Sequence, residues 1–198
     1  MIQTKRFVRT IACLVVTLML LAPASYADTD NLMDTWMQTV DETFLNQQYI
    51  DMDGAYLGQC VDLAFFYAAE LFKDQNFRQT IGLGNANQLF WTANPEYFEA
   101  IAFDGSAPKV GDLILWDHWA GGHVVVVASV EEDGRVLTYE QNSNMMGTAP
   151  VTVRELIGPD YGLPYLSYQP IGYLRPNVEL YNPKKLEAPK KYITEVLQ

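Results

Sequence analysis

The sequence predicts an α+β fold, with helices early in the chain and a mostly antiparallel sheet after them. An apolar, alanine-rich segment at 60–72 is long enough for a buried helix, and the β-branched run at 123–130 is typical of a buried strand. A turn signal, Asp133-Gly134, separates that run from a second strand-like segment at 135–142. Helices that precede the strands, rather than alternate with them, favour α+β over a doubly wound sheet.

Size and charge exclude several classes of protein. The 198 residues allow one domain with a small appendage, and 49% hydrophobic residues supply a sizeable core, which excludes a disordered chain. A net charge of -11 argues against nucleic acid as a partner, because that binding needs a basic surface. Two cysteines are too few for a disulfide framework or a cysteine-rich zinc site.

The first 27 residues have the three-part layout of a secretory signal peptide. Three basic residues precede an apolar run at 11–22, and small residues follow at 25–27. A membrane-spanning helix needs about 20 apolar residues, which is more than this run provides. We therefore expect cleavage after residue 27, a secreted or periplasmic protein and no membrane span afterwards; an uncleaved anchor is the alternative.

Cleavage would leave Cys60 as the single thiol of a strongly acidic protein. Residues 1–27 hold three of the 13 basic residues and no acidic ones, so ten basic and 24 acidic residues remain, a net charge of -14. A lone thiol in an oxidising compartment needs a reason. It is either an inert core cysteine or a nucleophile.

The other expected elements follow in chain order. They are an amphipathic helix within 28–48, a polar loop at 51–58, a loop with short helical pieces at 74–94, a short helix at 95–102, strands at 112–116, 151–154 and 171–174, and a tail at 178–198. The tail contains prolines and lysines, so we expect the folded domain to end near residue 177.

Cys60 lies at the start of the predicted helix, where a thiol is placed to react. The unpaired N–H groups of a helix N-terminus favour the thiolate, and nearby N–H donors can hold a developing oxyanion. A thiol nucleophile needs a base, and the chain has two histidines, His118 and His123. We favour His123, because a base on a strand is aimed more accurately than one in a loop, such as His118.

The base in turn needs an acceptor for its second nitrogen. If the hairpin closes with a two-residue turn, His123 lies opposite Asn144, with Asn142 diagonal to it and Glu140 one step further on the same face. A three-residue loop would put these side chains on the other face. The residues alone therefore predict a cysteine, a histidine and either an asparagine or a glutamate.

Four segments together resemble the CHAP family, the cysteine- and histidine-dependent amidohydrolases/peptidases. They are DMDGAYLGQCVDL around Cys60, GDLILWDHWAGGHVVVVASV around His123, VLTYEQNSN around Glu140, and GYLRP at 172–176. Each segment alone is a weak signal, whereas all four in order are a strong one. The resemblance covers residues 49–177. Over this range the chain is similar to the catalytic domain of phage endolysins.

The resemblance implies a papain-like (NlpC/P60-type) fold and a role for each site residue. Cys60 would be the nucleophile and His123 the base, with Glu140 as third residue and Asn142 as fourth. Gln59 matches the residue on the oxyanion side. The family thus ranks Glu140 above Asn142, and strand twist or a bulge would bring Glu140 nearer.

The implied activity is hydrolysis of peptidoglycan through an acyl-enzyme, without an organic cofactor. The bond would be a peptide cross-link or the amide between N-acetylmuramic acid and L-alanine. We expect a monomer that acts on peptidoglycan, with a cognate inhibitor protein as a further candidate partner. Two alternatives remain: thiol acyl transfer on a protein substrate, and a non-catalytic secreted calcium-binding module.

An acidic loop precedes the cysteine. Asp51 and Asp53 alternate in a tight loop, and Asp62 follows one turn into the helix, which suits calcium and its oxygen ligands. The alternative is a set of turn residues and a helix-start acid. The arrangement is similar to the calcium site of some phage-endolysin CHAP domains, which implies backbone ligands from Ala55 and Leu57.

Aromatic residues are candidates for a substrate groove, since glycans and peptides stack on aromatic faces. Trp119, in the glycine-rich loop before His123, is the best placed, with Tyr56 and Trp91 as further candidates. Trp116, on a predicted strand, is expected in the core.

Overall fold

The computed structural model describes residues 32–118, 121–143, 145–158, 161 and 169–177. The predicted signal peptide, the tail at 178–198, Trp119 and Asn144 lie outside the described residues. Within the described part of the chain, no helix is long and apolar enough to cross a membrane.

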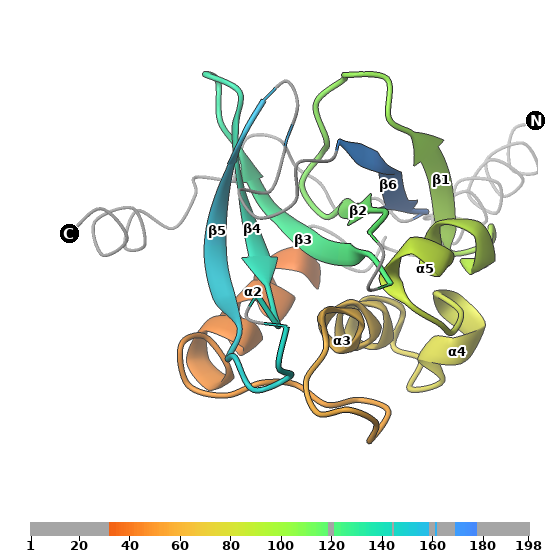
Figure 1. The fold of residues 1–198 in the computed structure, drawn as a ribbon, viewed down its shortest axis with the longest axis vertical. Helices are drawn as coiled ribbons and strands as arrows, with labels where there is room; N and C mark the ends of the chain where they lie inside the picture. The colour runs from red at the N-terminus through yellow and green to blue at the C-terminus, as the bar shows by residue number, and fades with distance from the viewer. Residues whose placement is uncertain (1–31, 119–120, 144, 159–160, 162–168, 178–198) are drawn as a thin grey trace, which may run out of the picture.

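In the described part of the chain, four helices precede a six-stranded antiparallel sheet (Figure 1). The helices are α2 (Leu32–Thr43), α3 (Cys60–Phe72), α4 (Phe77–Thr80) and α5 (Ala86–Thr92). The strands are β1 (Phe98–Ala102), β2 (Leu113–Trp116), β3 (His123–Val130), β4 (Arg135–Glu140), β5 (Thr152–Ile157) and β6 (Pro170–Pro176), in the spatial order β1-β6-β2-β3-β4-β5. This arrangement agrees with the predicted α+β class.

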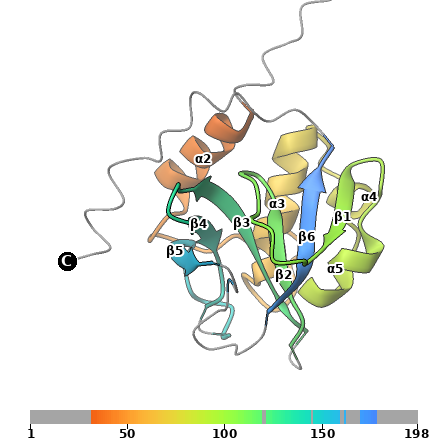
Figure 2. The ribbon, with the colours of Figure 1, turned by 90° about the horizontal axis from the view of Figure 1, so that it is seen from above.

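Alternation along the strands gives the sheet two buried faces. One face, which includes Leu113 and Val126, forms the main core with the helices, and the other, which includes Ile114 and Val125, forms a second apolar cluster. Figure 2 shows α3 lying along one face of the sheet, and the strand that it contacts most is β3. A strand buried on both faces explains why β3 is an almost continuous apolar run.

Helix α3 is the central helix of the main core, and its ends are well defined. At its start the carboxylate of Asp62 accepts a hydrogen bond from the N–H of Gln59 at 2.8 Å. At its end Lys73 has the left-handed conformation, and its N–H bonds to the carbonyl of Ala69. Most side chains between these ends are buried, so tertiary packing fixes the helix and hence the position of Cys60, its first residue.

Helix α2 packs against α3 and the sheet. The indole of Trp36 contacts Tyr67 of α3 and Tyr139 of β4 edge to face, with ring centroids 5.0 and 5.4 Å away. The hydroxyl of Tyr139 donates to Asp41 of α2 at 2.7 Å. The predicted amphipathic helix is therefore part of the same core as the sheet.

The prediction of a helix at 95–102 is wrong, because Phe98–Ala102 form the edge strand β1. This strand pairs with β6, with Phe98 opposite Pro176. Phe98 is buried against Phe72, edge to face at 5.2 Å. Pairing with β6 and burial of Phe98 outweigh the weak local signal of a proline, a case of tertiary structure overriding local preference.

Candidate active site

Cys60 lies in a small pocket at the N-terminus of α3. As the first helical residue, it has a backbone N–H without an acceptor inside the helix. The pocket has a volume of about 160 Å³. Its lining residues come from the α3 start, the α5 start and the loops beside β3 and β4: Gln59, Cys60, Val61, Asn85, Ala86, Gly121, Gly122, His123, Asn142 and Met145.

His123 begins β3 directly behind two glycines that have positive φ angles of 102° and 83°. A Cβ on Gly122 would lie 2.4 Å from the carbonyl oxygen of Trp116 and 2.8 Å from the N–H nitrogen of Asn87. The carbonyl of Gly121 accepts a hydrogen bond from that same N–H at 3.1 Å. The glycine pair therefore lets β3 begin against α5, which sets the position of the imidazole.

We expect Gly122→Ala to destabilise the protein by about 1–3 kcal/mol and to lower its activity at least tenfold. The added methyl group must displace backbone atoms on two sides and thereby move His123. Thermal unfolding and activity are the two measurements. Gly134→Ala is the matched control, since its φ is also positive at 86° but its Cβ would meet open space. Equal effects of both substitutions would contradict the close-packing argument.

The hairpin between β3 and β4 differs from the two-residue turn considered above. The N–H of Glu131 bonds to the carbonyl of Arg135, so three residues form the loop. This loop length turns the side chains of β4 to the opposite face of the sheet, but a bulge between Val127 and Ser129 turns them back. When this register is continued to the start of β3, Glu140 lies diagonal to His123 on the same face of the sheet. A two-residue turn without a bulge would have placed Glu140 one pair further along the strand.

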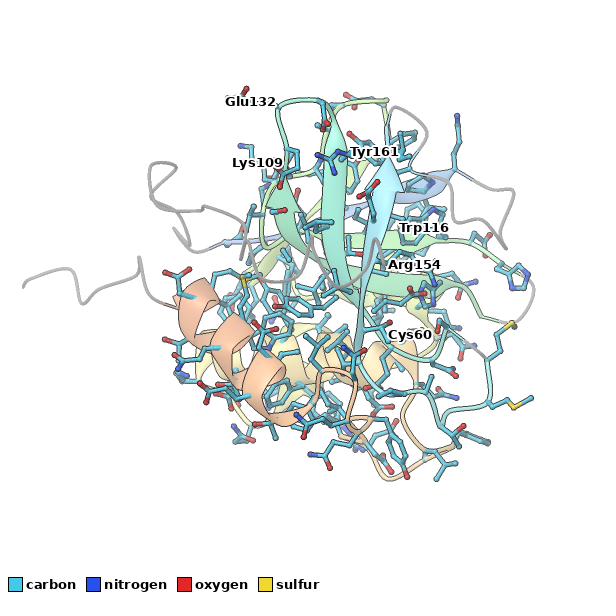
Figure 3. The ribbon with its side chains drawn as sticks, turned by 90° about the vertical axis from the view of Figure 1, so that its left-hand side faces the viewer. Cys60, Lys109, Trp116, Glu132, Arg154 and Tyr161 are labelled. Atoms are coloured by element: carbon cyan, nitrogen blue, oxygen red, sulfur yellow. The ribbon has the colours of Figure 1, made fainter. Side chains whose placement is uncertain are left out.

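The imidazole of His123 is held by a buried carboxylate. Its Nε2 lies 3.0 Å from Oε1 of Glu140, which has no exposed surface. The other oxygen of Glu140 accepts a hydrogen bond from Nε of Arg154 on β5. Figure 3 shows Arg154 and Cys60 on the same side of the molecule. Since Nε2 faces Glu140, Nδ1 is the nitrogen available to Cys60.

The pKa of His123 reflects these neighbours. Burial alone would lower it, but the charge of Cys60 and hydrogen bonds to Cys60 and Glu140 outweigh burial and raise the pKa from 6.5 to about 9. An imidazole with this pKa is protonated at neutral pH. The pocket therefore combines a thiol at a helix N-terminus with an imidazolium, which is the arrangement of a thiol nucleophile and its proton donor.

Asn142, the other candidate for the third residue, has a different set of contacts. Its side-chain oxygen accepts a hydrogen bond from the N–H of Gly147 at 2.6 Å, and its φ is +63°. It lines the pocket and shapes the loop after β4. His118 is outside the pocket lining, and its carbonyl accepts from the N–H groups of Gly121 and Gly122. The structure thus brings Glu140, and not Asn142, against His123.

Only some of the other residues predicted to contact the substrate line the pocket. Gln59 lines the pocket. Tyr56 and Trp91 are 84% and 78% exposed and lie outside the pocket lining, so they can contact only a substrate that extends beyond it. Trp116 is fully buried, as expected of a core residue.

The acidic loop brings three carboxylates together. Oxygen atoms of Asp51, Asp53 and Asp62 all lie within 4.8 Å of one another, which is close enough for one calcium ion to contact all three. Asp62 is buried, which raises its pKa to about 6, and it accepts hydrogen bonds from the N–H groups of Met52 and Gln59. The donor set fits calcium, whereas ligation by the carbonyls of Ala55 and Leu57 stays a prediction.

Residues 50–142 match the family model described as "CHAP domain". The chain carries a CHAP domain. A search of curated proteins found no match. Among solved structures, the chain is similar to "The crystal structure of Ly7917", at a TM-score of 0.51 and 18% identity over 73% of this chain.

The chain spans 62% of the length of that solved structure, and the low identity makes the likeness one of fold. CHAP domains are generally hydrolases. Arg154 lies beyond the matched residues. Sequence reasoning missed it, because only the β4–β5 register shows that Arg154, opposite Thr138, is a diagonal neighbour of Glu140.

Proposed function

We propose that this protein is an exported cysteine hydrolase that cleaves amide bonds of peptidoglycan through an acyl-enzyme at Cys60. The observation that supports it most is the Cys60–His123–Glu140 arrangement, in which Nε2 of His123 lies 3.0 Å from a buried carboxylate and the pKa of the imidazole is raised by Cys60 and Glu140. The proposal includes a papain-like frame over residues 49–177, a signal peptide at 1–27 and a secreted or periplasmic location. The bond is a stem-peptide cross-link or the N-acetylmuramoyl-L-alanine amide.

The chemistry follows from the protonation states. The Cys60 thiolate attacks the carbonyl carbon, and N–H donors at the start of α3 stabilise the oxyanion. His123 gives its Nδ1 proton to the leaving amine as the C–N bond breaks. The neutral imidazole then takes a proton from water, which attacks the thioester and releases the acid and the thiolate. Glu140 keeps the ring oriented throughout.

The test is digestion of purified sacculi of several cross-bridge types by residues 28–198, with millimolar calcium present. Mass spectrometry of the soluble fragments identifies the bond, since free glycan indicates an amidase and cut cross-links indicate an endopeptidase. Protein alkylated at Cys60 serves as the control. Absence of new termini from every sacculus would sink the hydrolase proposal and favour the non-catalytic calcium-binding module.

We further propose that Asp51, Asp53 and Asp62 bind calcium. A bound ion would neutralise charge in a loop that leads directly into α3, so its role is to hold that loop and the helix start. The clustering of the three carboxylates supports this.

Millimolar calcium is expected to raise the melting temperature of chelator-treated protein by at least about 3 °C, because it binds only the folded loop. Asp53→Asn should remove most of this shift. Asp133→Asn, a change at another exposed acidic turn, should keep it. Magnesium, which demands a tighter octahedral site, should have a smaller effect. A calcium shift that Asp53→Asn leaves intact would refute the site.

A further inference from the structure

Gln141 is a fully buried amide between two site residues, Glu140 and Asn142, and it contacts neither the thiol nor the imidazole in any described hydrogen bond. Its side chain instead crosses to the segment that leads into α3. The oxygen accepts from the N–H of Ile50 at 2.7 Å, and the nitrogen donates to the carbonyl of Ile50 at 2.8 Å. The same nitrogen donates to the carbonyl of Gln59 at 2.7 Å.

The bond to Gln59 matters because of what lies on the other side of that peptide group. A trans peptide is planar, so its C=O and its N–H point in opposite directions. The carbonyl of Gln59 and the N–H of Cys60 belong to one such plane. A side chain that holds the carbonyl therefore also fixes the direction of the Cys60 N–H, which points away from Gln141.

Both backbone groups of Gln59 are held by side chains. Its N–H donates to the buried carboxylate of Asp62 at 2.8 Å, and its carbonyl accepts from Gln141. The carbonyl also accepts from the N–H of Asp62, at 3.1 Å, in the first turn of the helix. The peptide plane before the thiol is thus constrained from the helix on one side and from the end of β4 on the other.

We propose that Gln141 is a positioning residue that aims the backbone N–H of Cys60 as an oxyanion donor. The inference rests on the proposed function, because an oxyanion forms only when Cys60 attacks a carbonyl. By the same contacts, Gln141 ties the beginning and the end of the loop at 50–59 to the strand that carries Glu140. It thereby keeps the donor in register with the thiol and imidazole.

The decisive experiment compares two reactions of Cys60, one that forms an oxyanion and one that does not. Acylation by p-nitrophenyl acetate passes through a tetrahedral oxyanion, whereas alkylation by iodoacetamide needs only the thiolate. Gln141→Met keeps the size of the side chain and removes its hydrogen bonds. We expect it to slow acylation about 10- to 100-fold while alkylation changes by less than about threefold and keeps its pH dependence.

A second variant keeps the shape and part of the bonding. Gln141→Glu retains an acceptor for the N–H of Ile50 but turns an acceptor toward the carbonyl of Gln59, so it should slow acylation at least as much as methionine. Tyr67→Phe is the matched control. It removes another buried side chain-to-carbonyl bond, 2.8 Å to Gly111, from α3 itself, and should leave the ratio of the two rates unchanged.

The outcomes are distinct. A selective loss of acylation in both Gln141 variants supports the positioning role. Unchanged acylation, or an equal loss of both reactions, overturns it, since the latter is what a merely structural residue would give. If the wild-type protein releases nothing from sacculi, the proposed function fails, and the ratio of ester acylation to alkylation still decides the role of Gln141.

Discussion

Replacing Cys60 with serine is expected to lower the release of wall fragments on the order of 10³-fold or more. A hydroxyl group is a far weaker nucleophile than a thiol and is not ionised at neutral pH, so the serine variant should hardly attack the substrate. The imidazole changes as well. Without the Cys60 charge, one of the causes that raise the pKa of His123 is gone, so this pKa should fall.

The measurements are fragment release and the proton NMR titration of the two histidines. The His123 signal should titrate near pH 9 in the wild type and at a lower pH in Cys60→Ser. The melting temperature should hardly change, because the side chains are nearly equal in size. Activity within tenfold of wild type would mean that the nucleophile lies elsewhere.

The sequence predicts the site's primary elements because each has a local signature. The buried helix beginning at Cys60 and the strand beginning at His123 appear with the same bounds in the structure. A long apolar segment and a β-branched run are signals of burial that tertiary packing reinforces. The segment at 95–102 lacks such a signal, and its conformation depends on β6, with which it pairs only through residues 172–176.

The contacts that orient His123 could be identified only from the structure. Glu140 reaches the imidazole through a three-residue loop followed by a bulge, two irregularities that cancel in their effect on the facing of side chains. Gly134 suits a two-residue or a three-residue loop, and no distinctive residue marks the bulge. Arg154 and Gln141 act through pairings between distant segments, which spacing along the chain does not reveal. The residue types of the site were therefore more predictable than the connections that hold them.

Glu140→Gln is expected to reduce kcat/KM by about 10²- to 10⁴-fold and to move the alkaline limb of its pH profile downward. In the wild type, activity should fall as the pH rises through about 9, where His123 loses the proton that the leaving amine needs. The glutamine has no charge to stabilise the imidazolium, so the pKa of His123 drops. Glutamine also has one acceptor oxygen where glutamate has two, so in either orientation its NH₂ group faces another donor, the guanidinium of Arg154 or the Nε2–H of His123.

The stability of the protein should also depend on the protonation of His123. The pKa of His123 is raised in the folded state, so the stabilisation from its protonation is complete below pH 6.5 and is lost as the pH rises through about 9. In Glu140→Gln this loss should begin at a lower pH.

Glu155→Gln is the matched control, because Glu155 lies on β5 but pairs with Arg135 away from the pocket. The pH profiles of kcat/KM and of unfolding should therefore shift together for Glu140→Gln and stay at the wild-type position for Glu155→Gln. A Glu140→Gln profile that still breaks near pH 9 would show that Glu140 does not set the charge of His123.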